Sequence, residues 1–185
     1  MTPAPSSGAS PARPDAAAVP VSASVSAPDE AASVEALAVA AALPPGFRAM
    51  PRMGAFIALN GPLCLRHEGD LVRLGFRVDE RHTNPLGICH GGMMATFCDM
   101  LLPMTIHRKS REVGLRFLPT INLQVDYLAP APLGAWIEGE AQVLRTTRTL
   151  VFAQGLVTAD GTPCARVSGI FKIGPPFDPT VEAAG

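Results

Sequence analysis

Asp99 is the only charged residue in an apolar stretch that runs from Gly91 to Ile106. The Met, Ala, Phe and Leu content of this stretch predicts a helix. Residues three and four positions from Asp99 along that helix carry no cation, and a mid-helix position excludes an N-cap role. A carboxylate in such a setting can act as a general base that activates water. An Arg or a backbone amide from another element that pairs with Asp99 is the structural alternative.

The segment before this helix could stabilise a developing negative charge. From Asn84 to Gly92 it reads NPLGICHGG and leads directly into the helix N-terminus. Unpaired backbone amides at that position, together with the helix dipole, favour an oxyanion. Glycine at 91 and 92 lets a ligand approach the backbone closely. The alternative is a tight loop-to-helix turn in which His90 is a hydrogen-bonded packing residue.

The spacing of the two features has a geometric consequence. Eight residues separate Gly91 from Asp99, which is roughly 12 Å along a helix axis at about 1.5 Å per residue. A general base must reach its target through a hydrogen bond or one water. One chain therefore has difficulty bringing both groups to the same carbonyl. Two chains related by a twofold axis could do so, which predicts a homodimer with composite sites.

The surrounding sequence predicts strands that position this helix. From about Phe56 strand patterns begin, and residues 72–78 alternate between apolar and polar side chains. Residues 120–127 alternate most clearly and predict a half-buried strand. Segments 135–144, 150–158 and 164–173 follow with short turns and predict an antiparallel meander. The result is an α+β arrangement in which a curved antiparallel sheet encloses one central helix. Pro103 is expected to kink or end that helix.

Composition bounds the organisation and the location of the protein. The 185 residues suffice for one domain with a hydrophobic core. We predict a disordered Ala/Pro/Ser-rich tail over residues 1–27, an N-terminal helix and linker over 28–45, the domain over 46–175 and a short tail over 176–185. A net charge of −1 gives no support for nucleic-acid binding.

The cysteines and the apolar runs point to a compartment. The four cysteines form no CxxC pair, which indicates reduced thiols in a cytoplasmic protein. No apolar run reaches the roughly 20 residues of a membrane helix, and the N-terminus lacks the pattern of an export signal.

A family resemblance joins these features. Asn84, followed six positions later by His90-Gly91-Gly92 and then by Asp99 nine positions after the histidine, resembles the phenylacetyl-CoA thioesterase-like (PaaI-type) family of hotdog-fold acyl-CoA thioesterases. The resemblance covers about residues 46–174. Pro103 and the Met-rich character of the helix are departures from the family pattern. Methionine side chains would suit a flexible acyl group, and simple core filling explains them equally well.

The resemblance implies roles for matching residues. Asp99 would activate water or attack the thioester directly, the Gly91 amide would polarise the carbonyl, and Asn84 would bind that carbonyl or orient the water. His90, Gly92 and Thr120 would contact the substrate or its water. An acyl-CoA substrate is implied, with no metal or redox cofactor. The CoA phosphates need cations. The candidates are Arg148, which we favour because of the turn it occupies, Arg145, and the 107–111 run.

Three alternatives accompany this reading. A metal site from residues such as His82, Cys89 and His90 matches no zinc spacing. A hotdog dehydratase fits the Asn-HGG-Asp pattern less well than hydrolysis does. A non-catalytic acyl-CoA-binding protein, acting as sensor or carrier, remains the main rival. The sequence does not separate a dimer from a tetramer, and it does not identify the acyl group.

Overall fold

The computed structural model describes residues 43–51 and 53–176. The predicted tail 1–27, the predicted helix 28–42 and residues 177–185 lie outside this part of the chain. The first half of the described chain contains β1 (Arg48–Ala49), α2 (Gly54–Asn60), β2 (Cys64–Glu68), β3 (Leu71–Arg77), the 3-10 turn η1 (Glu80–His82) and α3 (Gly91–Lys109). The second half contains β4 (Thr120–Tyr127), β5 (Trp136–Thr146), β6 (Leu150–Ala159) and β7 (Thr162–Lys172).

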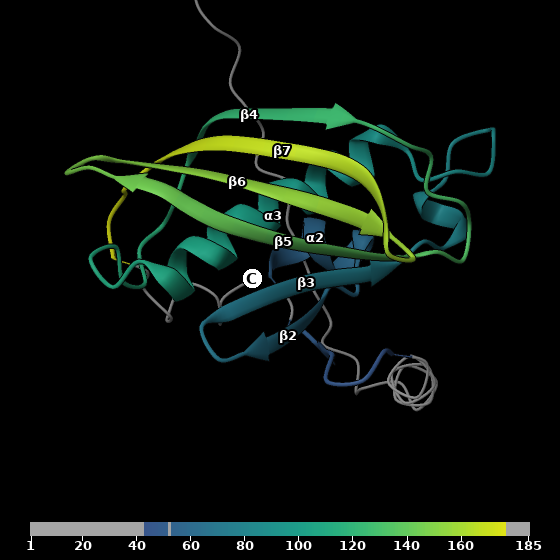
Figure 1. Cartoon of the computed structure of the whole chain (residues 1–185), viewed down its shortest axis with the longest axis horizontal. Helices are drawn as coiled ribbons and strands as arrows, with labels where there is room; N and C mark the ends of the chain where they lie inside the picture. Colours follow the sequence, from purple (N-terminus) through teal and green to yellow (C-terminus); the bar gives the residue numbers. More distant parts are fainter. Residues whose placement is uncertain (1–42, 52, 177–185) are drawn as a thin grey trace, which may run out of the picture.

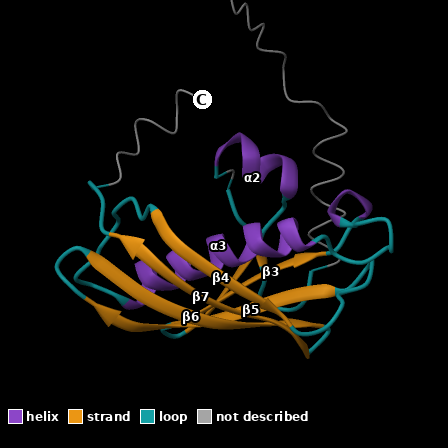
Figure 2. Ribbon diagram, turned by 90° about the horizontal axis from the view of Figure 1, so that it is seen from above, coloured by secondary structure: helices purple, strands orange, loops and turns teal. Residues whose placement is uncertain are grey.

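One antiparallel sheet organises the described residues (Figure 1). Its strand order is β1-β2-β3-β5-β6-β7-β4, so β5, β6 and β7 form the predicted meander, while β4 joins at the far side of β7. Helix α3 interrupts the sequence between β3 and β4 and lies across the concave face of the sheet (Figure 2). This arrangement confirms the predicted α+β hotdog fold.

Two glycines allow α3 to approach the sheet closely. A Cβ atom at Gly139 of β5 would stand 2.5 Å from the Leu101 side chain, and one at Gly169 of β7 would stand 2.8 Å from Leu102. The helix buries Phe97, Leu101 and Leu102 completely against the strands. These contacts form the centre of the core and fix the position of α3, and therefore of Asp99, over the sheet.

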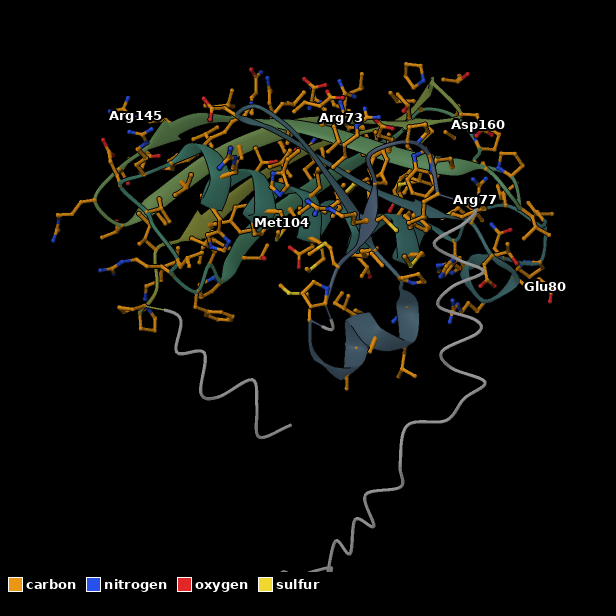
Figure 3. The ribbon with its side chains drawn as sticks, turned by 90° about the horizontal axis from the view of Figure 1, so that it is seen from below. Arg73, Arg77, Glu80, Met104, Arg145 and Asp160 are labelled. Carbon is orange, nitrogen blue, oxygen red and sulfur yellow. The ribbon has the colours of Figure 1, made fainter. Side chains whose placement is uncertain are left out.

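The structure corrects three expectations about the helices. Residues 54–60 form the short helix α2 where strand patterns were expected to begin, and Figure 2 shows α2 on the side of α3 that faces away from the sheet. Of the two outcomes expected at Pro103, a kink or an end of the helix, the second is wrong: α3 continues to Lys109. Nor is α3 enclosed on all sides: Asp99, Met100, Pro103 and Met104 are only half-buried in the single chain. Met104 projects from this part of α3 (Figure 3).

Strand β4 is more exposed than its alternation predicts. It occupies an edge of the sheet, and in the described residues it pairs only with β7. Ile121 is 59% exposed and Tyr127 is 57% exposed. Leu123 and Val125 pack partly against the core. An edge strand with exposed apolar side chains is a surface that another chain can cover.

Two further observations on the described residues concern helix length and thiols. None of the helices there is long and apolar enough to cross a membrane. All four cysteines are free thiols.

Candidate active site

Asp99 meets a hydroxyl and not a cation. The Thr120 hydroxyl donates a hydrogen bond to Asp99 Oδ1 over 2.7 Å. Thr120 is the first residue of β4, so the bond joins the middle of α3 to the beginning of the edge strand. Among the described residues no Lys or Arg pairs with Asp99. The carboxylate is thus oriented by a neutral partner and keeps its second oxygen Oδ2 for water or substrate.

A bulge in β4 aims Thr120 at Asp99. Strict alternation would place Thr120 on the face opposite to Leu123 and Val125, which point to the core. The register with β7 shifts between Thr120 and Asn122, so that Ile121 is an extra residue in the strand. Bulges turn a side chain to the other face of a sheet. The sequence identified Thr120 only through the family resemblance, because a bulge leaves no mark in a period of two.

His90 caps α3 and leaves the next amide available. The His90 Nδ1 atom accepts a hydrogen bond from the Gly92 N–H over 2.9 Å, which is the geometry of an N-cap. In the described residues no hydrogen bond uses the Gly91 N–H, which lies at the first position of the helix. The Gly91 carbonyl accepts a bond from the Tyr127 hydroxyl over 2.8 Å. The Gly91 amide therefore remains a free donor at the positive end of the helix dipole.

Tyr127 is a residue of this region that the sequence did not identify. A Cβ atom at Gly91 would stand 3.4 Å from its ring and its hydroxyl. Burial raises the pKa of the Tyr127 hydroxyl, so it stays protonated and donates. The alternation of residues 120–127 presents Tyr127 as one more apolar strand residue, and no sequence signal distinguishes it.

Asn84 and Gly91 line the same cavity. It has a volume of about 410 Å³, and Met94, Tyr127 and Cys164 also contribute to its walls. The Asn84 Oδ1 atom accepts from the Leu86 N–H over 2.9 Å, which fixes the side chain within its loop. Its Nδ2 amide has no partner among the described residues. Two residues with an N–H donor that has no partner among the described residues, Asn84 and Gly91, thus line one cavity.

Asp99 does not line this cavity. The structure joins Asn84, Gly91 and Tyr127 at one end of β4, and Asp99 with Thr120 at the other end. The two groups that the sequence assigns to one reaction therefore occupy separate places in a single chain, as their helical spacing predicts.

Arg148 lies at the Asp99 end of the molecule. It lines a cavity of about 440 Å³ together with Arg116, Glu112, Thr146, Thr147 and Ile173. The Gly174 N–H bonds to the Phe117 carbonyl, and the Lys172 N–H bonds to that of Pro119. These bonds hold the end of β7 beside the beginning of β4. Arg145, three residues before Arg148, lies at this same end of the sheet, opposite to Glu80 and Asp160 (Figure 3).

The predicted basic run 107–111 begins in the last turn of α3, and its first three side chains contact different parts of the molecule. The Arg108 guanidinium donates to the Gly69 carbonyl, while the His107 ring is hydrogen-bonded to the Arg116 carbonyl. Lys109 Nζ donates to the Ala141 carbonyl on the outer face of the sheet. Of these three side chains, His107 alone contacts a residue that lines the Arg148 cavity.

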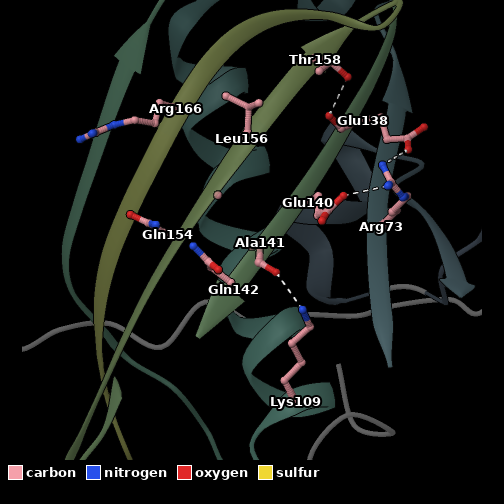
Figure 4. Close-up of a pocket in the computed structure, with 11 residues that line it drawn as sticks. Arg73, Lys109, Glu138, Glu140, Ala141, Gln142, Gln154, Leu156, Thr158 and Arg166 are labelled. Carbon is pink, nitrogen blue, oxygen red and sulfur yellow. Dashed lines mark hydrogen bonds and ion pairs between the residues drawn. The ribbon is translucent and has the colours of Figure 1, made fainter. Parts of the chain in front are cut away.

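A larger cavity, of about 640 Å³, lies on the outer face of the sheet, and of the predicted candidates it contains only Lys109 from the 107–111 run. Its cations are engaged: Arg73 pairs with Glu138 and Glu140, and Lys109 reaches the Ala141 carbonyl (Figure 4). It holds neither a free carboxylate near a hydroxyl nor a helix N-terminus. We therefore place the candidate site at α3 and β4 despite the smaller cavity volumes there.

The thiols near Gly91 are not activated nucleophiles. Burial raises the pKa of the Cys89 thiol to about 11 and that of Cys98 to about 12. A thiol with such a pKa is protonated near neutral pH and reacts slowly. In residues 43–51 and 53–176, no group of three or more His, Cys, Asp or Glu side chains is arranged to hold a metal ion.

Comparison with known proteins identifies the family. Residues 86–165 match the model of the thioesterase superfamily. A Pseudomonas aeruginosa protein named "Putative esterase PA0474" is 28% identical over 71% of this chain and 97% of its own length. Mouse acyl-coenzyme A thioesterase 13 is 35% identical over 78 residues, which are 42% of this chain and 53% of that protein. The chain thus spans about half the length of the mouse relative.

Solved structures agree with these matches. Zebra fish thioesterase superfamily member 2 is 30% identical, with a TM-score of 0.54 over 60% of this chain and 81% of that one. A PaaI protein from Thermus thermophilus shares the fold at 22% identity, with a TM-score of 0.52 over 64% of this chain and 98% of that one. The family model and these relatives therefore show that the chain belongs to the thioesterase superfamily.

Proposed function

We propose that this protein is an acyl-CoA thioesterase that hydrolyses a thioester to a free acid and CoA, with Asp99 as its catalytic carboxylate. The observation that carries the proposal is the pair of separated half-sites. One half presents a carboxylate oriented by the Thr120 hydroxyl, and the other presents a cavity lined by Asn84 and Gly91, each with an N–H donor that has no partner among the described residues. A CoA thioester is supported by the similarity to mouse acyl-coenzyme A thioesterase 13.

Pairing of two chains through β4 would unite the half-sites. Thr120 and Tyr127 lie at opposite ends of β4, roughly 23 Å apart at the rise of a strand. Antiparallel strands about a twofold axis bring the beginning of one beside the end of the other. Asp99 and Thr120 of one chain would then approach the Gly91 cavity of the second. The exposed Ile121 and Tyr127 side chains would be covered by the same contact. Two such dimers could form a tetramer.

The reaction at such a site has two steps. Asp99 takes a proton from water as the water oxygen bonds to the thioester carbonyl carbon. The carbonyl oxygen becomes an oxyanion that accepts hydrogen bonds from Gly91 N and Asn84 Nδ2. The oxyanion then collapses, the carbon–sulfur bond breaks, and the thiolate of CoA leaves with the proton that Asp99 holds. Direct attack by Asp99 would give an anhydride that water must cleave; hydrolysis in ¹⁸O-labelled water distinguishes the two.

The phosphates of CoA would bind in the cavity that Arg116 and Arg148 line. This cavity belongs to the chain that supplies Asp99, so one chain would hold the CoA phosphates and deliver the base. Bidentate contacts between arginine and phosphate are strong and directional. His90 would support the site because it caps α3. Gly92 would support it because its lack of a side chain lets the substrate approach the backbone closely. The cytoplasmic location remains a prediction.

Thiol release from a panel of acyl-CoA substrates tests the proposal. We expect turnover with at least one acyl group, and Asp99→Asn should reduce kcat at least a thousandfold while substrate still binds. Asp126→Asn is the matched control, because Asp126 is a β4 carboxylate that pairs with Arg166. Binding without turnover in the wild-type protein would instead establish the rival function, an acyl-CoA sensor or carrier.

A further inference from the structure

His82 is a buried polar residue that the proposed reaction does not use. It ends η1 and is only 3% exposed. Its ring is hydrogen-bonded at both nitrogens: the Asp79 N–H donates to Nδ1 over 3.1 Å, and Nε2 donates to the Asn60 carbonyl over 3.1 Å. This pattern defines a neutral ring with its proton on Nε2.

The backbone of His82 holds the segment that leads to Gly91. The His90 N–H donates to the His82 carbonyl over 2.7 Å, one residue before the proposed oxyanion donor. Thr83 and Cys89 form a further antiparallel bridge in the same loop. Asn84, the second proposed donor, follows His82 by two residues. The position of His82 therefore determines where both ends of this loop lie.

The ring of His82 also connects the loop with both helices. Its bond to Asn60 reaches the last residue of α2, which lies on the side of α3 that faces away from the sheet (Figure 2). Its face packs edge-on against Phe76, with ring centroids 5.3 Å apart, and Phe76 packs against Phe97 at 5.2 Å. Phe97 lies on α3 two residues before Asp99. The His82 side chain thus contacts α2, the loop and β3 directly, and it is linked to α3 through Phe76.

We propose that His82 is a positioning residue that fixes the Asn84–Gly91 loop in the geometry required for oxyanion binding. The inference rests on the proposed thioesterase function for its kinetic consequence, while its effect on the loop is independent of any activity. Only the neutral ring fits, because a second proton on Nδ1 would oppose the Asp79 N–H donor to donor.

The surroundings of His82 keep it neutral. Burial lowers its pKa below the ordinary value, and the Arg81 cation lowers it further. The Asp79 carboxylate and the backbone groups of Asn60 and Arg77 act in the opposite direction and only partly offset this. The neighbours from β3 and α3, Phe76 and Phe97, are uncharged. The folded protein thus disfavours protonation, whereas the unfolded chain takes up the proton at about pH 6.5. Stability from this residue is therefore lost as the pH falls below about 6.5 and through the lower folded-state pKa.

Two substitutions at His82 test the proposal. His82→Phe keeps the ring packing and removes both side-chain hydrogen bonds, whereas His82→Asn keeps an acceptor for the Asp79 N–H. We expect kcat to fall about tenfold to a hundredfold in His82→Phe, since small displacements of catalytic groups cost rates of this order. KM should change little, and His82→Asn should restore part of kcat. Protonation of His82 at acid pH should lower kcat in the wild-type protein. This part of the decrease should be absent in His82→Phe.

Amide hydrogen exchange provides a readout that needs no activity. Exchange at residues 90–93 and at 60–61 should accelerate in His82→Phe. Val157→Ala, a core substitution on β6, is the control for general destabilisation and should leave both kcat and this local exchange unchanged. Unchanged kcat and unchanged exchange at 90–93 in His82→Phe would overturn the proposal. If the wild-type protein binds acyl-CoA without turnover, the thioesterase function fails and the exchange result alone decides the role of His82. If His82→Phe does not fold, exchange in His82→Asn and in wild type below pH 6 decides it.

Discussion

A neutral hydroxyl is an informative partner for the Asp99 carboxylate. An arginine would hold the carboxylate in an ion pair, whereas the Thr120 hydroxyl orients Oδ1 at 2.7 Å without adding a charge. This bond fixes the direction of Oδ2, which stays available for water or substrate. At the scale of the residue, the decisive feature is the single hydrogen bond from Thr120, at the bulge of β4, to Asp99.

Removing that hydrogen bond should slow turnover with little effect on folding. Thr120→Val conserves the shape of the side chain and lacks the donor, so Asp99 loses its orientation. We expect kcat to fall about tenfold or more, with KM nearly unchanged, in the thiol-release assay. Thr120→Ser keeps the hydroxyl and should retain most of the activity. Equal kcat values in Thr120→Val and wild type would mean that Thr120 has no part in orienting the base.

At the scale of elements, the sequence predicted what local periodicity can encode. The alternation in residues 72–78 and in the last three strand segments predicted β3 and the meander, and the composition of residues 91–106 predicted α3. Helix α2 was missed because GAFIALN is too short to reveal a helical period. The bulge at Ile121 and the Tyr127–Gly91 bond depend on long-range packing, which no local pattern records. Pro103 is tolerated inside α3 because packing against the sheet holds the helix on both sides of it.

Helix α3 also contains a stability cost that can be removed. The Thr105 hydroxyl is fully buried and has no hydrogen-bond partner within residues 43–51 and 53–176. An unsatisfied buried hydroxyl costs about 1 kcal/mol or more. Thr105→Val conserves the shape and should raise the free energy of unfolding by about 1 kcal/mol in urea denaturation. Thr96→Val is the matched control on the same helix, because the Thr96 hydroxyl donates to the Gly92 carbonyl and should give no gain. A loss of stability in Thr105→Val would show that its hydroxyl has a partner in solution.

At the scale of the whole molecule, the proposed reaction would require a second chain. Neither end of β4 contains all the groups that the proposed reaction needs, and the Ile121 and Tyr127 side chains of this strand are exposed in the single chain. The sequence led to this expectation through the rise of a helix alone. The structure adds the edge strand as the surface through which two chains can pair.

Mixing two inactive variants tests the composite site directly. Asn84→Ala damages one half-site and Asp99→Asn the other, so each homodimer should be inactive. When equal amounts are unfolded and refolded together, half of the dimers contain one chain of each kind, and each has one intact site. Activity should recover to about one quarter of the wild-type value. Recovery should fail if both groups act within one chain, and a monomer with full activity in analytical ultracentrifugation would exclude the composite site.

The close approach of α3 at Gly139 and Gly169 also limits how related sequences can vary. A methyl group at either position would occupy space that Leu101 or Leu102 fills, and the sheet cannot yield because its own strands are hydrogen-bonded on both sides. A larger residue at 139 must therefore displace the side chains of Leu101 and Phe97, and one at 169 must displace those of Leu102 and Phe171. Each glycine should therefore change in evolution together with these two neighbours. Where such a group does change, the helix that carries Asp99 can keep its distance from the sheet.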